Sequence, residues 1–464
     1  MSEQTANLKD QLFMKRKNGR LVSEDSVLAA ADDFCIGYAD FLNTGKTERE
    51  CVCAAIEILK AHGFNEFDPN ASYKAGDRIY TNIHNKSLIA AVFGNLGLEN
   101  GTEMVCAHID SPRLDLKPNP LYESEEFALF KTHYYGGIKK YQWTAIPMAL
   151  HGVVIKKGGE CINICIGEEE NEPCFVVTDL LPHLSAEQDK RTLREGIKGE
   201  ELNVLIGSHP FKDDSESELV KLNIMNIINK KYGITEEDFL SAELECVPAF
   251  KARDIGFDGS MMGAYGHDDR VCAYPALMAL CDTYKPEKTA IVVLADKEEI
   301  GSCGNTGLES SMLRDFISDI AALQGVRPEV VLRKSECLSA DVNAALDPTF
   351  SDVHERLNAA RVNYGAVITK YTGARGKSGT SDASAEFVAE VRRFLDEAGV
   401  VWQTGELGKV DMGGGGTVAV YVANMGVNVV DLGVPVLSMH APFEVVGKFD
   451  VYMTYLACFE FFKK

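Results

Sequence analysis

Basic residues are scarce in this 464-residue sequence: 47 Lys and Arg stand against 69 Asp and Glu, which leaves a formal net charge of −22. A surface of this sign repels phosphate backbones and anionic lipid headgroups, so we expect neither nucleic acid nor a membrane as a partner. The sequence also lacks any apolar run near the roughly 20 residues that span a bilayer. Its first residues have no apolar core of the kind that a secretory signal carries. We therefore expect a cytoplasmic protein.

The thirteen cysteines include no Cys-x-x-Cys pair, since Cys51 and Cys53 are two apart and Cys161 and Cys165 are four apart. Apolar contexts such as that of Cys106 are typical of reduced thiols in a protein core. The sequence therefore disfavours both a disulfide framework and a zinc site made of thiolates.

The arrangement of apolar runs predicts an interrupted α/β fold. Residues 1–114 begin with two helical patterns and continue with β-branched runs that read as strands. Residues 115–250 alternate short apolar runs with glycines and charged pairs, which indicates an inserted β-rich module. Strands separated by helical stretches resume in residues 251–464. We expect an α/β fold in which a largely parallel or mixed sheet is flanked by helices.

Histidine and acidic clusters follow several of the expected strands, where the ligands of an α/β sheet bind. These clusters are HID at 108–110, DKEE at 296–299, SAD at 339–341 and SMH at 438–440, and a fifth, YGHDDR at 265–270, precedes a helix. One such cluster alone is weak, because a lone histidine is usually structural and a Glu pair is usually a solvated turn. Five together indicate a metal site of imidazoles and carboxylates, which suits zinc, manganese or cobalt. They also supply the bridging, terminal and free carboxylates that a two-metal site needs.

Five segments of the chain resemble the M18 aminopeptidases, the family of aspartyl aminopeptidase and aminopeptidase I. They are AHIDSPRLDLKP (107–118), HDDR (267–270), DKEEIGS (296–302), SADVNAALDP (339–348) and SMHAPFE (438–444). The resemblance covers essentially the whole chain. It implies a co-catalytic zinc exopeptidase fold, with residues 115–250 as an inserted dimerisation domain, and assembly of twelve subunits into a tetrahedral shell.

The same resemblance implies roles for individual residues around two Zn²⁺ per subunit, with Co²⁺ or Mn²⁺ as alternatives. The implied metal ligands are His108, Asp268, Glu299, Asp341 and His440, with Asp268 bridging both ions. Glu298 is the implied general base, and Asp110 is implied to orient His108. From the residues alone, the choice between the two glutamates stays open. The family geometry further implies a cis peptide bond between Asp268 and Asp269, whereas the role of Asp269 stays open.

His183, in the segment LLPHLS, is a further candidate. It is either a structural loop histidine or, as the resemblance implies, a catalytic residue that reaches a neighbouring subunit's active site. The preferred first residue of the substrate also stays open. An acidic residue would need a cation such as Lys370, Arg375 or Lys377, whereas other members of the family prefer neutral residues.

The favoured hypothesis is a dinuclear zinc aminopeptidase that removes the amino-terminal residue from short peptides. A first alternative keeps the metal pair but acts as an amidohydrolase on N-acyl amino acids. A second alternative is a self-assembling shell or cargo protein with little turnover. The complete set of candidate ligands favours the enzyme over the shell protein.

Overall fold

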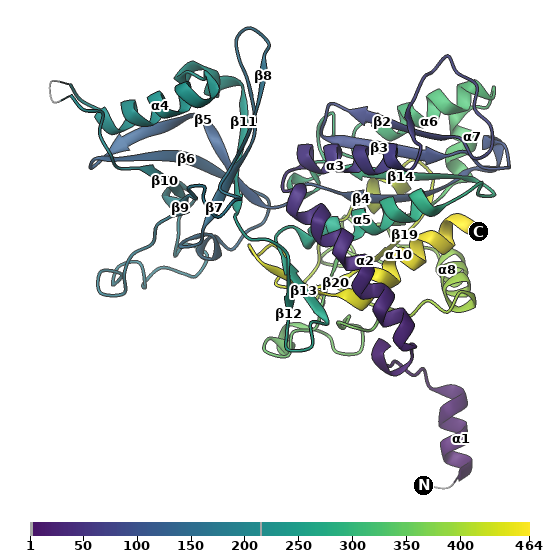
Figure 1. Ribbon diagram of the computed structural model, residues 1–464. Coiled ribbons are helices and arrows are strands. Elements are labelled where there is room, and N and C mark those ends of the chain that lie inside the picture. The colour runs from purple at the N-terminus through teal and green to yellow at the C-terminus, as the bar shows by residue number, and fades with distance from the viewer. Residues whose placement is uncertain (1–2, 214–215) are drawn as a thin grey trace.

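A nine-stranded mixed sheet forms the centre of the larger lobe of the protein (Figure 1). The computed structural model describes residues 3–213 and 216–464. In spatial order the strands are β1 (Asn65–Glu66), β2 (Arg78–Ile83), β3 (Ser87–Val92), β14 (Thr289–Ala295), β4 (Thr102–His108), β15 (Glu336–Ser339), β19 (Asn428–Gly433), β17 (Ala366–Thr369) and β18 (Trp402–Thr404). The four central strands β14, β4, β15 and β19 are parallel. Every residue of β3, β4 and β14 is buried, as expected for strands covered on both faces.

Helices cover the two faces of this sheet and form two separate hydrophobic cores. Alternate residues of one strand enter different cores: Val105 packs in the first, whereas Met104 and Cys106 pack in the second. The first core is built with α2 (Asp25–Thr44), α3 (Glu48–Ala61), α5 (His267–Asp282), α8 (Ala385–Glu397) and α10 (Lys448–Lys463). The second is built with α6 (Met312–Leu323), α7 (Pro328–Arg333) and α9 (Ala419–Ala423). Helix α1 (Glu3–Leu12) precedes them at the amino terminus.

The smaller lobe is a seven-stranded antiparallel sheet with its own hydrophobic core (Figure 1). Its strands, in spatial order, are β8 (Cys161–Ile166), β7 (Met148–Ile155), β11 (Ala242–Pro248), β5 (Arg113–Ser124), β6 (Phe127–Tyr135), β10 (Asn203–Gly207) and β9 (Val176–Val177). Helix α4 (Leu219–Tyr232) packs against this sheet. We refer to these elements as the inserted sheet. The expected β-rich character of residues 115–250 is present, whereas the domain boundaries and a role in dimerisation stay predictions.

A third sheet of five short strands was not expected from the sequence. It consists of β12 (Arg253–Ile255), β13 (Met261–Ala264), β21 (Glu444–Gly447), β20 (Pro435–Leu437) and β16 (Asn343–Ala344). Strands of two to four residues are too short to show a period-2 pattern. This sheet matters for the site because the loop between β20 and β21 carries His440.

The expected α/β fold class, with a mixed sheet between helices, is therefore confirmed. All thirteen cysteines are free thiols in the described part of the chain. Among the described helices, none combines the length and the apolar character needed to cross a bilayer.

Candidate metal centre

The clusters expected at strand ends meet at one edge of the central sheet. Ala295, the last residue of β14, lies beside His108, the last residue of β4. The end of β15 lies next to β4 on its other side, which brings Asp341 to the same edge. The turn after β14 contains Glu298 and Glu299. The parallel register of β14, β4 and β15 therefore gathers side chains that are far apart in the sequence, such as those of His108 and Asp341.

Asp268 lies between the two candidate histidines. Its Oδ1 atom is 3.2 Å from Nε2 of His108, and its Oδ2 atom is 3.1 Å from Nε2 of His440. Nε2 of His440 also lies 3.4 Å from Oε1 of Glu299. The implied cis peptide bond between Asp268 and Asp269 is present. One carboxylate that faces a different imidazole with each oxygen has the arrangement of a bridging metal ligand.

The second ring nitrogen of each histidine faces an oxygen atom. Nδ1 of His108 lies 3.1 Å from the carbonyl oxygen of Asp110 and 3.3 Å from its Oδ1 atom. Nδ1 of His440 lies 2.7 Å from the carbonyl oxygen of Gly137. A carbonyl oxygen only accepts, so Nδ1 is the protonated nitrogen in the neutral form of each ring. Each Nε2 lone pair is then directed at the space around Asp268.

The donor atoms of the centre fit a metal ion of the zinc type. Atoms of His108, Asp268 and Glu299 converge within 4.8 Å of one another, and so do atoms of His108, Asp269 and Asp341. Nε2 of His108 and Oε1 of Glu299 are buried, and neither makes a hydrogen bond of acceptable geometry to any described residue. Imidazole nitrogen and carboxylate oxygen are zinc ligands. A cation would satisfy both of these buried atoms.

The raised pKa values of the carboxyl groups at the centre also fit a site for divalent cations. Burial raises the pKa of Glu298 to about 7. Burial and the neighbouring Asp268 raise the pKa of Glu299 well above its ordinary value, and burial together with Asp269 does the same for Asp341. Burial and neighbouring negative charge both disfavour the ionised form of a carboxyl group. Divalent cations at this place would stabilise their ionised forms.

Glu444 holds the two central ligands by their backbone amides, a role that the sequence did not reveal. This side chain, 1% exposed, begins strand β21. Its Oε1 atom accepts a hydrogen bond from the amide of His440 at 2.7 Å, and its Oε2 atom accepts one from the amide of Asp268 at 3.1 Å. The only available signal was its place in the SMHAPFE segment, because Asp268 lies far away in the sequence.

Asp269 is fully buried beside the ligand strand, and its Oδ2 atom accepts a hydrogen bond from the amide of His108 at 3.3 Å. The adjacent Arg270 donates to the carbonyl oxygens of Ile109 and Lys46. Asp269 therefore supports the strand that carries His108.

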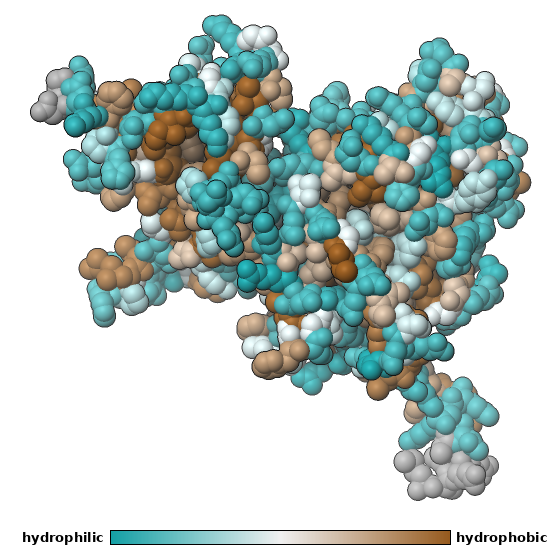
Figure 2. All heavy atoms as spheres, viewed as in Figure 1, coloured by the Kyte–Doolittle hydropathy of each residue, from teal (hydrophilic) through white to brown (hydrophobic). Residues whose placement is uncertain are grey.

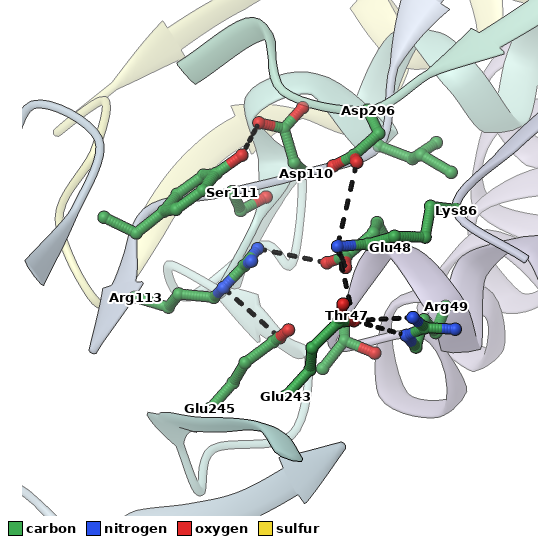
Figure 3. A network of polar contacts seen from close by, with 12 residues as sticks. Thr47, Glu48, Arg49, Lys86, Asp110, Ser111, Arg113, Glu243, Glu245 and Asp296 are labelled. Carbon is green, nitrogen blue, oxygen red and sulfur yellow. Dashed lines mark hydrogen bonds and ion pairs between the residues drawn. The ribbon is translucent and has the colours of Figure 1, made fainter. Parts of the chain in front are cut away.

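Asp110 connects the centre to a buried ion-pair network between the two lobes (Figure 3). Figure 3 shows Lys86 and Arg113 on either side of the Glu48 carboxylate, with Asp110 and Asp296 nearby. Arg113 lies 3.1 Å and Lys86 lies 3.0 Å from oxygens of Glu48. Although burial opposes it, these two cations lower the pKa of Glu48 to about 2. The network therefore places fixed charges beside the loop that follows His108.

A cavity of about 460 Å³ opens next to the centre. It is lined by Asp268, Glu298, Glu299, Asp341 and His440, together with Gly414, Gly415 and Gly416. Two larger cavities, of about 610 and 750 Å³, lie away from this site and have mainly apolar walls. The smaller cavity is the candidate substrate site because five of the candidate site residues line it.

The remaining candidates from the sequence lie outside this cavity. His183 is exposed and is not among its lining residues. Lys377 pairs with Asp382 at 2.9 Å, and with Arg375 it lines a neighbouring cavity of about 260 Å³. Within one subunit, the structure therefore brings together Asp110, Glu298 and the five candidate ligands, but not His183.

A second group of ligand-type atoms, from Glu50, His151 and Cys165, lies between the two lobes. Nδ1 of His151 is 2.7 Å from Glu50, and its Nε2 atom is 3.0 Å from Glu168. Lys46 lies 2.7 Å from the same Glu168 oxygen. Both imidazole nitrogens are engaged by carboxylates, so this group is an ion-pair network and not an open set of ligands.

The sequence and the structure of this chain are both similar to those of known metallopeptidases. The family described as aminopeptidase I zinc metalloprotease (M18) matches residues 41–462. A probable M18 family aminopeptidase 1 from Clostridium acetobutylicum is 50% identical over 431 residues, which cover 91% of this chain and 93% of that protein. The crystal structure of an M18 aminopeptidase from Thermotoga maritima matches with a TM-score of 0.94 and 45% identity, covering 97% of this chain and 100% of that one. The dodecamer of mApe1 from S. cerevisiae matches with a TM-score of 0.74 and 21% identity, covering 94% and 97%, which shows a shared fold.

Proposed function

The chain belongs to the M18 family of zinc metalloaminopeptidases, and we propose that it removes single amino-terminal residues from short peptides at a two-metal centre built around Asp268. The observation that carries this proposal is the position of Asp268, with one carboxylate oxygen near each of His108 and His440. Aminopeptidase activity is the activity named for the family and for its relatives.

The proposed ligand set divides around Asp268. His108 and Asp341 would hold one metal ion, Glu299 and His440 would hold the other, and Asp268 would be the ligand that both share. The convergence of His108 with Asp341 and the 3.4 Å distance between Nε2 of His440 and Oε1 of Glu299 support this division. When bound, the ions supply Lewis acidity for the scissile carbonyl and make water a better nucleophile at neutral pH.

Glu298 is the proposed general base. Its side chain is 19% exposed, and an Oε atom lies 3.8 Å from Nε2 of His108, so it faces the centre from the cavity side. Its carboxylate accepts a proton from the attacking water and returns it to the leaving amine. Asp110 fixes the turn that carries Glu298, because its Oδ1 and Oδ2 atoms accept hydrogen bonds from the amides of Glu298 and Glu299, both at 3.1 Å.

Self-assembly into a dodecamer through the inserted sheet is part of the proposal. An apolar cavity of about 610 Å³, lined by residues such as Phe127, Ile164 and Ile227, opens on that sheet. Figure 2 shows hydrophobic side chains exposed on this lobe, next to helix α4. Exposed apolar surface of this kind is typical of protein interfaces.

In such an assembly, His183 from one subunit donates a hydrogen bond in a neighbour's site. The free thiols agree with a cytoplasmic location.

Paired substrates test the proposal. Each of several aminoacyl-p-nitroanilides is offered with a free and with an acetylated amino terminus, after the protein has been loaded with zinc, cobalt or manganese. We expect release of p-nitroaniline only from the unblocked substrates. Release of acetate from N-acetyl amino acids, without release of p-nitroaniline from the unblocked substrates, would instead establish the amidohydrolase alternative. Absence of hydrolysis of both kinds of substrate with every metal would favour the shell protein.

A further inference from the structure

Three consecutive residues, Tyr135, Gly136 and Gly137, bring the inserted sheet into contact with the metal centre. Tyr135 is the last residue of β6 and pairs in register with Arg113, the first residue of the antiparallel strand β5. Strand β5 starts five residues after His108. The register of this strand pair therefore places the end of β6 beside the loop that leaves the first candidate ligand.

The hydroxyl group of Tyr135 contacts Asp110. It donates a hydrogen bond to Oδ2 of Asp110 at 2.8 Å. The same carboxylate faces Nδ1 of His108 at 3.3 Å and accepts the amides of Glu298 and Glu299. A carboxylate with this many partners has one orientation. Removal of the Tyr135 hydroxyl would take away one of the two hydrogen bonds to Oδ2, and so loosen the carboxylate on which both His108 and the glutamate turn depend.

The ring of Tyr135 is itself held in place. Its centroid lies 4.0 Å from the guanidinium carbon of Arg113, at the distance of a cation–π contact. Arg113, 4% exposed, is fixed in turn by Glu48 at 3.1 Å and Glu245 at 3.3 Å (Figure 3). The aromatic ring therefore keeps its place even when the hydroxyl group is removed.

The backbone of the next two residues reaches the other side of the centre. The carbonyl oxygen of Gly137 lies 2.7 Å from Nδ1 of His440. Gly136 has a φ of +75°, and a β-carbon there would lie 3.1 Å from Oε2 of Glu299. A side chain at position 136 would therefore strain the backbone and press on a candidate ligand. The chain passes this close to Glu299 because residue 136 is a glycine.

We propose that residues 135–137 are a positioning element of the metal centre, in which the Tyr135 hydroxyl orients His108 through Asp110 and the Gly137 carbonyl orients His440 directly. One strand end of the inserted sheet thereby fixes an imidazole at each of the two metal positions within its own subunit. Partners of the non-ligating imidazole nitrogen set ring orientation and ligand basicity. This inference rests on the proposed function, since it takes both histidines as metal ligands.

Tyr135→Phe tests the proposal, because it removes one hydroxyl group and keeps the ring. Tyr134→Phe is the matched control: its side chain is 39% exposed and belongs to the same strand. Each zinc-loaded protein is titrated with a chelator, its cobalt form is examined by visible absorption, and kcat and KM are measured separately. We expect Tyr135→Phe to retain metal 10- to 100-fold less tightly, with a changed cobalt spectrum, a lower kcat and a nearly unchanged KM. Tyr134→Phe should match the wild type.

Equal metal retention and equal cobalt spectra for Tyr135→Phe and the wild type would overturn the proposal. Gly136→Ala is the second variant, and we expect it to release one metal ion more readily because it presses on Glu299. Retention of both ions by Gly136→Ala would likewise count against the proposal. Unfolding of both Tyr135→Phe and Gly136→Ala would also count against it, because the proposal predicts changes at the metal centre only. A failure of the proposed function is distinguishable, because the wild type and Tyr134→Phe would then also lack metal-dependent peptide cleavage.

Discussion

The carbonyl oxygen of Gly137 lies 2.7 Å from the Nδ1 atom of His440, although the two residues are 303 positions apart. The contact joins the end of a strand in the inserted sheet to a loop between β20 and β21. It directs the Nε2 lone pair of His440 toward Asp268, which lies 3.1 Å away. The inserted sheet is therefore a structural part of the candidate metal centre within a single subunit.

Glu298→Gln should separate the chemical step from metal binding. The amide has the shape of the carboxylate but does not accept the proton of the attacking water. We expect kcat to fall by about 10²- to 10⁴-fold, the usual contribution of a general base, while metal content stays at the wild-type value. Steady-state kinetics and elemental analysis of the same preparation check this. Near-normal turnover would show that another group is the base.

Asp268→Ala should have a different effect, because it removes the side chain that faces both histidines. We expect loss of bound metal as well as loss of activity. Elemental analysis after dialysis measures the metal, and circular dichroism checks that the variant is folded. Two metal ions still bound per subunit would show that the bridging ligand lies elsewhere.

The ion pairs of His151 should make the stability of the protein depend on pH. Burial lowers its pKa, but hydrogen bonds with Cys165, Glu168 and Glu50 outweigh this effect and raise the pKa to about 11. Because the pKa is higher in the folded state, the stabilisation is complete below about pH 6.5 and is lost as the pH rises toward 11. One such proton changes the unfolding free energy by up to about 1.4 kcal/mol per pH unit.

The measurement is the melting temperature between pH 7 and pH 10 for the wild type, His151→Gln and the exposed control His209→Gln. We expect the wild type and the control to lose stability in parallel, and His151→Gln to be less stable at pH 7 with a shallower pH dependence. Parallel curves for all three proteins would contradict a charged His151 between Glu50 and Glu168.

The shared-site role of His183 predicts complementation between inactive subunits. His183→Ala and Glu298→Gln should each be nearly inactive alone. When they are mixed under conditions of subunit exchange, some sites combine an intact base with an intact donated histidine, so part of the activity should return. Full activity of His183→Ala alone would exclude the role, and so would mixed oligomers that stay inactive.

Local features of the fold were predictable because their causes are local. Thr47 and Glu50, three residues apart, form a capping box at the start of α3, and the continuous apolar run before His108 forms a buried strand. Long-range features were not predictable in the same way. Glu444 and Gly137 act on partners 176 and 303 residues distant. Neither type of contact leaves a period or a motif in the sequence.

For the candidate site, too, the sequence predicted the residue types but not the long-range contacts between them. Strand-end clusters indicated a metal centre, and the structure brings His108, Asp268, Glu299, Asp341 and His440 together. The structure adds the geometry that the residues alone did not supply. Glu299 lies 3.4 Å from Nε2 of His440, whereas Glu298 lines the cavity and lies 3.8 Å from Nε2 of His108. This difference supports Glu299 as the ligand and Glu298 as the base.

The most direct test of the two-metal account is a zinc titration of the metal-free protein, with the hydrolysis of an unblocked aminoacyl-p-nitroanilide measured at each addition. The account predicts that activity rises to a plateau at two equivalents of zinc per subunit, because both sides of Asp268 must be filled before water and carbonyl are activated together. A plateau at one equivalent, with no further zinc bound, would contradict it.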